Sequence, residues 1–193
     1  MDASFVEAPR QRNSRKENEQ IREGKRPEGF EKGSAKGRQK DCDASWTKKN
    51  GQRHYGYKNH AKVDAKSKLV TNYETTGGSV HDSQVFNALV DEKDEALLAD
   101  SAYLSESARE HLLECDCQDF IQLKSYRNRP LSEADKKTNK LISRIRVRVE
   151  HVFGRMSQMA MDRLRTIGRK QAHYHNGLSN LVYNMDRYAY LMR

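Results

Sequence analysis

A short apolar run ends abruptly in a carboxylate at Leu97-Leu98-Ala99-Asp100-Ser101-Ala102-Tyr103. This pattern is typical of a buried strand that presents an acid at its carboxyl end. Open α/β sheets carry their chemistry at the carboxyl ends of their strands. Asp100 is therefore the first candidate site residue.

Two further acids lie where they could join Asp100. Glu150 falls in a helix predicted from Ser132 to about Phe153, on the polar margin of its apolar face and beside Arg146. Asp2 stands at the very start, with no apolar strand before it to hold it in a sheet. We expect the function to depend on whether these three acids meet.

The remaining pattern predicts a mixed sheet with helices packed on it. The expected elements are a hairpin with strands over 54–63 and 69–76, a helix over 83–89 capped by Asp82 or Ser83, a helix from Ser105 to Glu114, a strand over 119–123 and a helix over 172–192. Ser132 and Asp135 resemble a capping box at the start of the long helix. The last helix carries apolar residues at Leu178, Leu181, Val182, Met185, Tyr188 and Met192.

The composition indicates one soluble domain, with an appendage at most. The 193 residues are 35% hydrophobic and 33% charged, and the formal net charge is +9. Clustered cations favour a polyanionic partner, and we favour nucleic acid over a membrane surface or a heparin-like chain. Three cysteines without a C-x-x-C pair indicate a reducing cytoplasm and no zinc site. No stretch reaches the ~18 apolar residues of a membrane span, so we expect no membrane partner.

Residues 10–50 are polar, glycine-rich and basic. Such a segment buries too little apolar surface to order itself, so we expect a long loop or an arm that settles on a partner. We divide the chain into 1–53, which holds Asp2 and the basic arm, and 54–193, which holds the core and the last helix.

Three carboxylates from separate elements suit phosphodiester chemistry with two magnesium ions. Mg²⁺ takes few protein ligands, mostly carboxylate oxygens. Two such ions clamp the attacking and leaving oxygens of an in-line displacement. At any single acid a solvated or capping role is the commoner one, and Asp100 stands out because an apolar run ends on it.

Several stretches together resemble the DDE transposases of bacterial insertion sequences, in particular the insertion-sequence-five type. They are residues 2–9, 46–51, 54–58, 98–103, 146–154 and 178–187, and the resemblance covers essentially the whole chain. It implies an α/β, RNase H-like domain. It also implies DNA cleavage and strand transfer at element ends that require Mg²⁺, with Mn²⁺ able to substitute.

The resemblance also assigns residues and partners. Asp2, Asp100 and Glu150 correspond to the catalytic, metal-binding acids, and Arg146 to the arginine that accompanies the glutamate. The implied partners are DNA at the terminal repeats and the target, together with a second copy or a full-length transposase. The implied location is the bacterial cytoplasm, at the nucleoid.

The chain departs from the family pattern at three places. Ser157 replaces a lysine and Ser143 replaces a tyrosine, which would weaken contacts to DNA phosphates. The DNA-binding region and the first core strand that precede the first aspartate in the family are not found ahead of Asp2. We therefore expect the C-terminal, N-terminally truncated portion of a transposase. The alternative function is an inactive fragment that only binds DNA or regulates full-length transposase.

Other residues keep two interpretations. Asp82 could cap the helix that follows it, or it could act together with His81 to orient a metal ligand. We favour the helix cap. For Tyr103 packing is favoured over support of Asp100. Trp46 would stack on an unpaired base or anchor the arm. Four cations at helical spacing would follow a phosphate backbone or simply solvate their helix face; they are Arg144, Arg148, His151 and Arg155.

Overall fold

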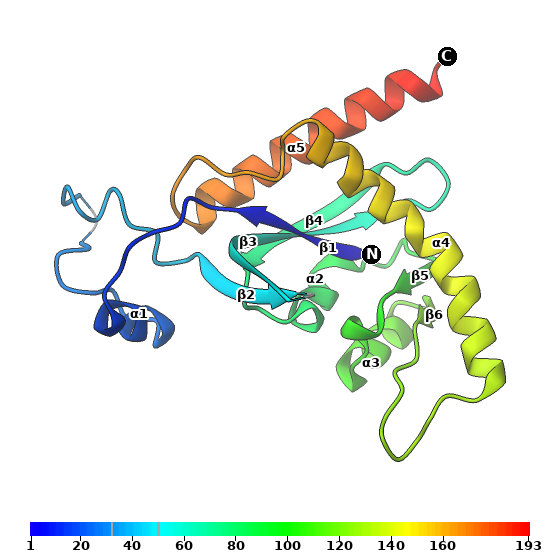
Figure 1. Cartoon of the computed structure of the whole chain (residues 1–193). Helices are drawn as coiled ribbons and strands as arrows, with labels where there is room; N and C mark the ends of the chain where they lie inside the picture. The colour runs from blue at the N-terminus through cyan, green and yellow to red at the C-terminus, as the bar shows by residue number, and fades with distance from the viewer. Residues whose placement is uncertain (32, 50) are drawn as a thin grey trace.

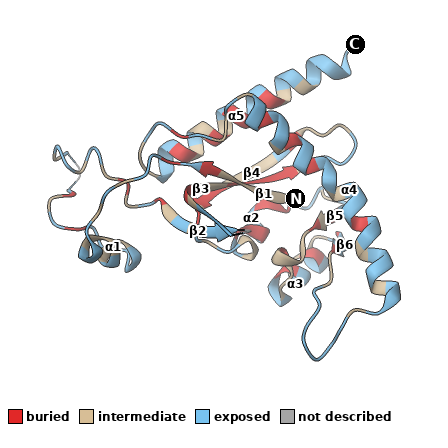
Figure 2. Ribbon diagram, viewed as in Figure 1, coloured by how far each residue is buried: buried red, intermediate tan, exposed pale blue. Residues whose placement is uncertain are grey.

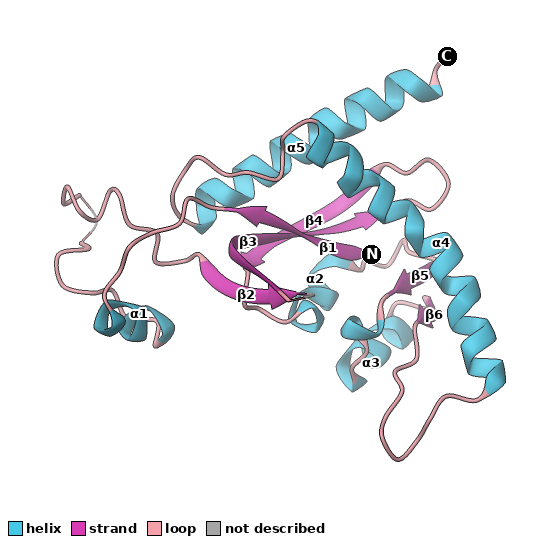
Figure 3. Ribbon diagram, in the orientation of Figure 1, coloured by secondary structure: helices cyan, strands magenta, loops and turns pink. Residues whose placement is uncertain are grey.

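The computed structural model describes residues 1–31, 33–49 and 51–193, and it confirms the expected α/β class with helices flanking the strands (Figures 1 and 3). Lys32 and Asn50, which belong to the predicted basic arm, lie outside the described residues. Among the helices of the described residues, none is long and apolar enough to cross a membrane.

Strand β3 (Gln52–Val63) is the centre of a four-stranded antiparallel sheet. Strand β1 (Asp2–Glu7) pairs along one edge, while β2 (Ser45–Lys49) and β4 (Val70–Gly77) follow one another along the other edge. The predicted hairpin is thus confirmed as β3 and β4. Gly56 allows β1 to come close, because its φ is +148° and a Cβ there would overlap the Val6 carbonyl oxygen.

Strands β5 (Ala96–Ala99) and β6 (Gln118–Ile121) form a separate parallel pair. The structure therefore has an antiparallel sheet and a parallel pair, where we expect a single mixed sheet. The two meet where the Met1 amino group donates a 2.8 Å hydrogen bond to the Leu98 carbonyl oxygen. Strand β1 diverges after this point because it follows β3 from Asp2 onward.

Helix α3 (Glu106–Glu114) connects β5 to β6, and a 3₁₀ turn, η1 (Asp82–Val85), leads into the short helix α2 (Phe86–Leu89) after β4. The second 3₁₀ turn, η2 (Ser101–Tyr103), follows β5 directly. Ser105 caps α3 as expected. These segments enclose an apolar core around Phe86, Leu89, Tyr103 and Leu112.

Helix α5 (Arg169–Leu191) and the carboxyl-terminal part of α4 (Glu133–Gln158) lie over one face of the antiparallel sheet, whereas the first part of α4 runs alongside β5 and β6 (Figures 1 and 2). The capping box of Ser132 and Asp135 is confirmed at the start of α4. Alternation along β3 sends Ala61 toward Val152 of α4 and Tyr183 of α5. The side chains of His60 and Lys62 therefore point to the opposite face, where η1 and the segment before β5 receive them.

Part of the basic arm is ordered, so the prediction that it cannot order itself is wrong there. Helix α1 (Arg15–Arg22) begins with a capping box between Ser14 and Glu17. Phe30 is fully buried, with two lysine ammonium groups near its ring. Pairing of β1 and β2 with β3 crosses the predicted division into 1–53 and 54–193, and that division stays a prediction.

Candidate active site

Asp2 is the first residue of β1 and pairs in register with Ala61 of β3. The expectation that no sheet would hold it is wrong, because the longer β3 supplies the ladder. Its side chain is only 17% exposed and contacts the guanidinium of Arg146 at 2.5 Å. Burial raises the pKa of Asp2 above its usual range, and the Ala3 amide and the Arg146 charge only partly oppose this.

Arg146 joins Asp2 to Glu150. Its Nη1 binds Asp2, and its Nη2 donates to Glu150 Oε1 at 2.9 Å. The second contact follows from helical spacing, since residues four apart on α4 lie on the same face. The Arg146 side chain is 15% exposed, and its Nε is buried with no hydrogen-bond partner among the described residues. Glu150 is 52% exposed, so this carboxylate faces the solvent.

Asp100 follows the last residue of β5, as the apolar run predicts. Its Oδ1 accepts a 3.2 Å hydrogen bond from the Ser101 hydroxyl. The bond from Met1 to Leu98 places the start of β1 beside the end of β5. Burial lowers the pKa of that Met1 amino group from 8.0 to about 6. The main chains that carry Asp2 and Asp100 are thus neighbours.

The side chains do not form a metal cage. Among residues 1–31, 33–49 and 51–193, no three His, Cys, Asp or Glu side chains lie close enough to hold one ion. Carboxylate oxygens are the donors that Mg²⁺ prefers, so the residue types fit the ion that the resemblance implies. In the structure the guanidinium of Arg146 lies between Asp2 and Glu150, so these two carboxylates are paired with a cation of the chain itself.

A buried polar layer lies beneath these residues, and the sequence reasoning missed its central member, His60. The His60 ring is fully buried, with Nε2 2.8 Å from the Thr76 hydroxyl and Nδ1 3.5 Å from the Tyr103 hydroxyl. Burial lowers the pKa of His60 to about 4, although the nearby Asp82 carboxylate opposes this. The available signal was alternation, since His60 stands between Lys58 and Lys62 on one face of β3.

Tyr103 belongs to this layer and is fully buried against Phe86, which confirms the packing interpretation. Burial raises the pKa of Tyr103, and the negative charges of Asp82, Asp2 and Asp100 raise it further. The Tyr103 side chain thus stays a neutral hydroxyl near the carboxylates of Asp82, Asp2 and Asp100.

Asp82 does not cap the helix that follows it, so the favoured interpretation is wrong. His81 is the cap residue, and its side chain accepts from the Ser83 amide. Asp82 instead accepts a 2.8 Å hydrogen bond from Lys58, whose ammonium reaches across from β3. Lys58, which is distant in sequence, therefore pairs with the Asp82 carboxylate that we expected at the start of the helix.

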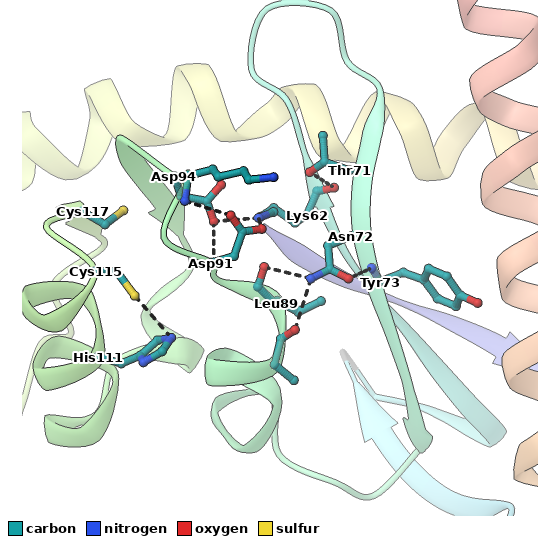
Figure 4. A network of polar contacts seen from close by, with 12 residues as sticks. Lys62, Thr71, Asn72, Tyr73, Leu89, Asp91, Asp94, His111, Cys115 and Cys117 are labelled. Carbon is teal, nitrogen blue, oxygen red and sulfur yellow. Dashed lines mark hydrogen bonds and ion pairs between the residues drawn. The ribbon is translucent and has the colours of Figure 1, made fainter.

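Lys62 ties the segment before β5 to the antiparallel sheet (Figure 4). Its ammonium contacts Asp91 at 2.8 Å and Asp94 at 2.6 Å, and its side chain is 8% exposed. Burial opposes the charge of Lys62, but the two carboxylates raise its pKa overall. This pairing holds the segment that leads into β5 against the antiparallel sheet. It therefore helps to position Asp100, which follows the last residue of β5.

The two serines that depart from the family pattern have structural partners. Ser143 accepts a 2.6 Å hydrogen bond from Gln122, just after β6. Ser157 donates to Asp162 at 2.6 Å, beyond the end of α4. Both hydroxyls therefore hold α4 in place, and their effect on DNA contacts stays a prediction.

The cationic row along α4 contacts neighbouring elements. Arg148 donates to the Ala65 carbonyl oxygen, the His151 ring lies 3.2 Å from the Lys68 ammonium, and Arg155 pairs with Asp186 at 2.9 Å. A pocket of about 370 Å³ opens beside this row, and its charged lining is Lys68, His151, Arg155, Asp186, Arg187 and Arg193. One acid against this many cations leaves the pocket with a positive charge.

Trp46 lies at the other end of the sheet. The residue is 46% exposed, and its ring packs against Tyr55, with the Arg10 guanidinium 5.6 Å from the ring centre. Trp46 therefore contacts the basic arm and still leaves half of its surface open, so both interpretations remain.

Comparison with known proteins now identifies the family. The profile of the family described as Transposase DDE domain matches residues 1–185. The chain belongs to the DDE transposase family. A relative in this family, the transposase for insertion sequence element IS1106 of Neisseria meningitidis serogroup B, is 38% identical over 117 residues.

That match covers 60% of this DDE transposase chain and 40% of the relative, so the chain spans less than half the length of the curated relative. No solved structure matches the chain significantly. The match confirms the resemblance drawn from residues, whereas the roles of Asp2, Asp100, Glu150 and Arg146 stay predictions.

Proposed function

We propose that this chain carries the acidic site of a transposase that cleaves DNA and transfers strands at insertion-sequence ends. The observation that carries the proposal is the junction of Asp2 and Glu150 through Arg146, beside the strand end that presents Asp100. The proposed domain is RNase H-like, and the proposed location is the bacterial cytoplasm, at the nucleoid.

The proposed metal ligands are Asp2, Asp100 and Glu150, with Mg²⁺ as the ion and Mn²⁺ able to substitute. When bound, such ions activate the attacking hydroxyl and steady the leaving oxygen of a phosphodiester. Arg146 already compensates two of these carboxylates with one positive charge. Three carboxylates and one guanidinium leave an excess of negative charge at the site. An excess of negative charge attracts cations, which supports the assignment.

The proposed partner is DNA, at the terminal repeats and the target. The net charge of +9 supports it, as do the cationic row on α4 and the positive pocket at its end. The basic arm, with Arg10 beside the open ring of Trp46, would bind DNA at a second place on the protein, separate from the three acids. We also propose self-association or pairing with a full-length transposase.

Cleavage of labelled DNA that carries the ends of the element tests this proposal. Wild-type protein in Mg²⁺ is expected to nick this DNA, and Asp100→Ala and Glu150→Ala are expected to abolish nicking. Glu133→Ala is the matched control, because Glu133 is an exposed acid on the same helix, remote in sequence from Arg146. Nicking that survives both Asp100→Ala and Glu150→Ala would overturn the assignment.

The absence of a three-acid cluster among the described residues favours one alternative, DNA binding without cleavage. In that case the protein would bind DNA with a steep salt dependence or regulate a full-length transposase. Salt-sensitive binding together with no nicking in either Mg²⁺ or Mn²⁺ would select this alternative.

A further inference from the structure

Helix α5 presents its polar stripe to the sheet. Asn176 donates to the Thr75 hydroxyl at 2.8 Å, and Asn180 exchanges hydrogen bonds with Asn59 of β3. Asn184 both accepts from and donates to the Val70 main chain at 2.8 Å, which satisfies the start of β4. These amide contacts fix the rotation of α5 about its axis.

The opposite stripe of α5 is apolar and open. Its members are Tyr174, Leu178, Leu181, Met185, Tyr188 and Met192, and each is between 53% and 69% exposed. This set is called the α5 seam below. In Figure 1 the carboxyl-terminal half of α5 projects beyond the strands, and in Figure 2 its outer side is exposed. A helix with an amphipathic pattern normally turns such a stripe inward.

The seam has the spacing of a coiled coil. Successive members are four, three, four, three and four residues apart, read from the sequence positions. Alternation of three and four keeps apolar side chains on one line along a helix, and that line packs against another helix by knobs into holes. The pattern therefore calls for a helical partner rather than a flat surface or a small ligand.

The positions flanking the seam carry no fixed charge. They are His175, Gly177, Val182, Asn184, Ala189 and Leu191. Charged residues at these flanking positions normally select or reject a partner helix. Their lack of charge leaves nothing to repel an identical helix, so the seam is compatible with itself.

The open area is that of a stable contact. Aromatic and long apolar side chains offer roughly 200 Å² each. Seam residues more than half exposed therefore leave on the order of 700 Å² open on one copy. A standard interface buries about 800 Å² on each partner.

We propose that the α5 seam is a self-association surface, and that two copies of this chain pair through antiparallel α5 helices. In this arrangement Leu178 of one copy faces Tyr188 of the other, Leu181 faces Met185, and Tyr174 faces Met192. Each tyrosine thus packs on an aliphatic side chain. A parallel pair would set each tyrosine against its own copy, and it would also align the helix dipoles unfavourably.

This inference deepens the self-association that belongs to the proposed function, yet it needs no DNA and no cleavage. The test is sedimentation velocity of the wild-type chain and of Leu178→Asp, without DNA. The wild type is expected to be a dimer at tens of micromolar, and Leu178→Asp a monomer. Leu113→Asp is the matched control, because Leu113 is an 81% exposed leucine on α3, and this variant is expected to stay dimeric.

The direction of pairing has its own test. Leu181→Lys and Met185→Asp are each expected to be monomeric, while their equimolar mixture is expected to form a heterodimer, because the introduced lysine of one chain then faces the introduced aspartate of the other. Circular dichroism checks that each variant keeps its helices. A monomeric wild type, a Leu178→Asp variant that stays dimeric, or dissociation by Leu113→Asp would overturn the surface. A monomeric mixture would overturn the antiparallel direction. Failure of cleavage would leave all of these outcomes unchanged.

Discussion

Replacing His60 by glutamine is expected to change how stability depends on pH. His60 is fully buried between Thr76 and Tyr103, and its pKa falls from 6.5 to about 4 in the folded protein. The charged groups that face it are Asp82, 3.9 Å away, and Lys58, which pairs with Asp82. Glutamine keeps an amide to meet the Thr76 hydroxyl but does not titrate.

The sign and size follow from proton linkage. Below pH 6.5 the unfolded chain binds a proton at His60, while the folded protein stays neutral there until about pH 4. Proton binding therefore stabilises the unfolded state as the pH falls. The contribution of His60 to the unfolding free energy is fully present only above pH 6.5. A difference of 2.5 pKa units corresponds to a loss of about 3 kcal/mol by pH 4.

Urea denaturation at several pH values measures this. The wild type is expected to lose about 3 kcal/mol more unfolding free energy than His60→Gln between pH 7 and pH 4. The Met1 amino group and the carboxylates titrate in both proteins, so the difference isolates His60. Equal losses in the two proteins would refute the buried, neutral histidine.

Two further predictions concern packing. Leu112→Ala is expected to cost about 2–5 kcal/mol because that side chain is 1% exposed, whereas Leu113→Ala should stay within about 0.5 kcal/mol of wild type in urea denaturation. Equal losses would contradict the orientation of α3. Gly56→Ala should lower the melting temperature sharply, since its Cβ has no room, while Gly154→Ala, which meets nothing within 4 Å in α4, should raise stability by about 1 kcal/mol. A harmless Gly56→Ala would contradict the pairing of β1 with β3.

Much of the fold was predictable from local signals. The β3–β4 hairpin, the caps at Ser105 and Ser132 and the acid at the end of β5 all followed from patterns within a few residues. These signals are reliable because the hydrogen bonds of turns and caps join near neighbours in sequence. The contact of Arg146 with Glu150 belongs to the same class.

The errors share a long-range cause. Asp82 was assigned to a helix end, but Lys58, distant in sequence, took its carboxylate. Asp2 was expected to lack a sheet, but β3 is long enough to pair with it. Each outcome depended on which segments meet, and a propensity reasoned from neighbours carries no information about that.

The order of amino acids was enough to predict every described helix except α1, most of the strands, the positive charge, the family and the identity of the candidate acids. Three features emerge only in the folded chain: Arg146 also holds Asp2, His60 is buried neutral beneath the site, and α5 turns its asparagines inward. All three features depend on which distant segments meet. In the case of α5, a buried asparagine amide must find hydrogen-bond partners, and folding decides where unpaired groups of the strands lie. The apolar stripe of α5 was visible in the sequence, but its exposure was not.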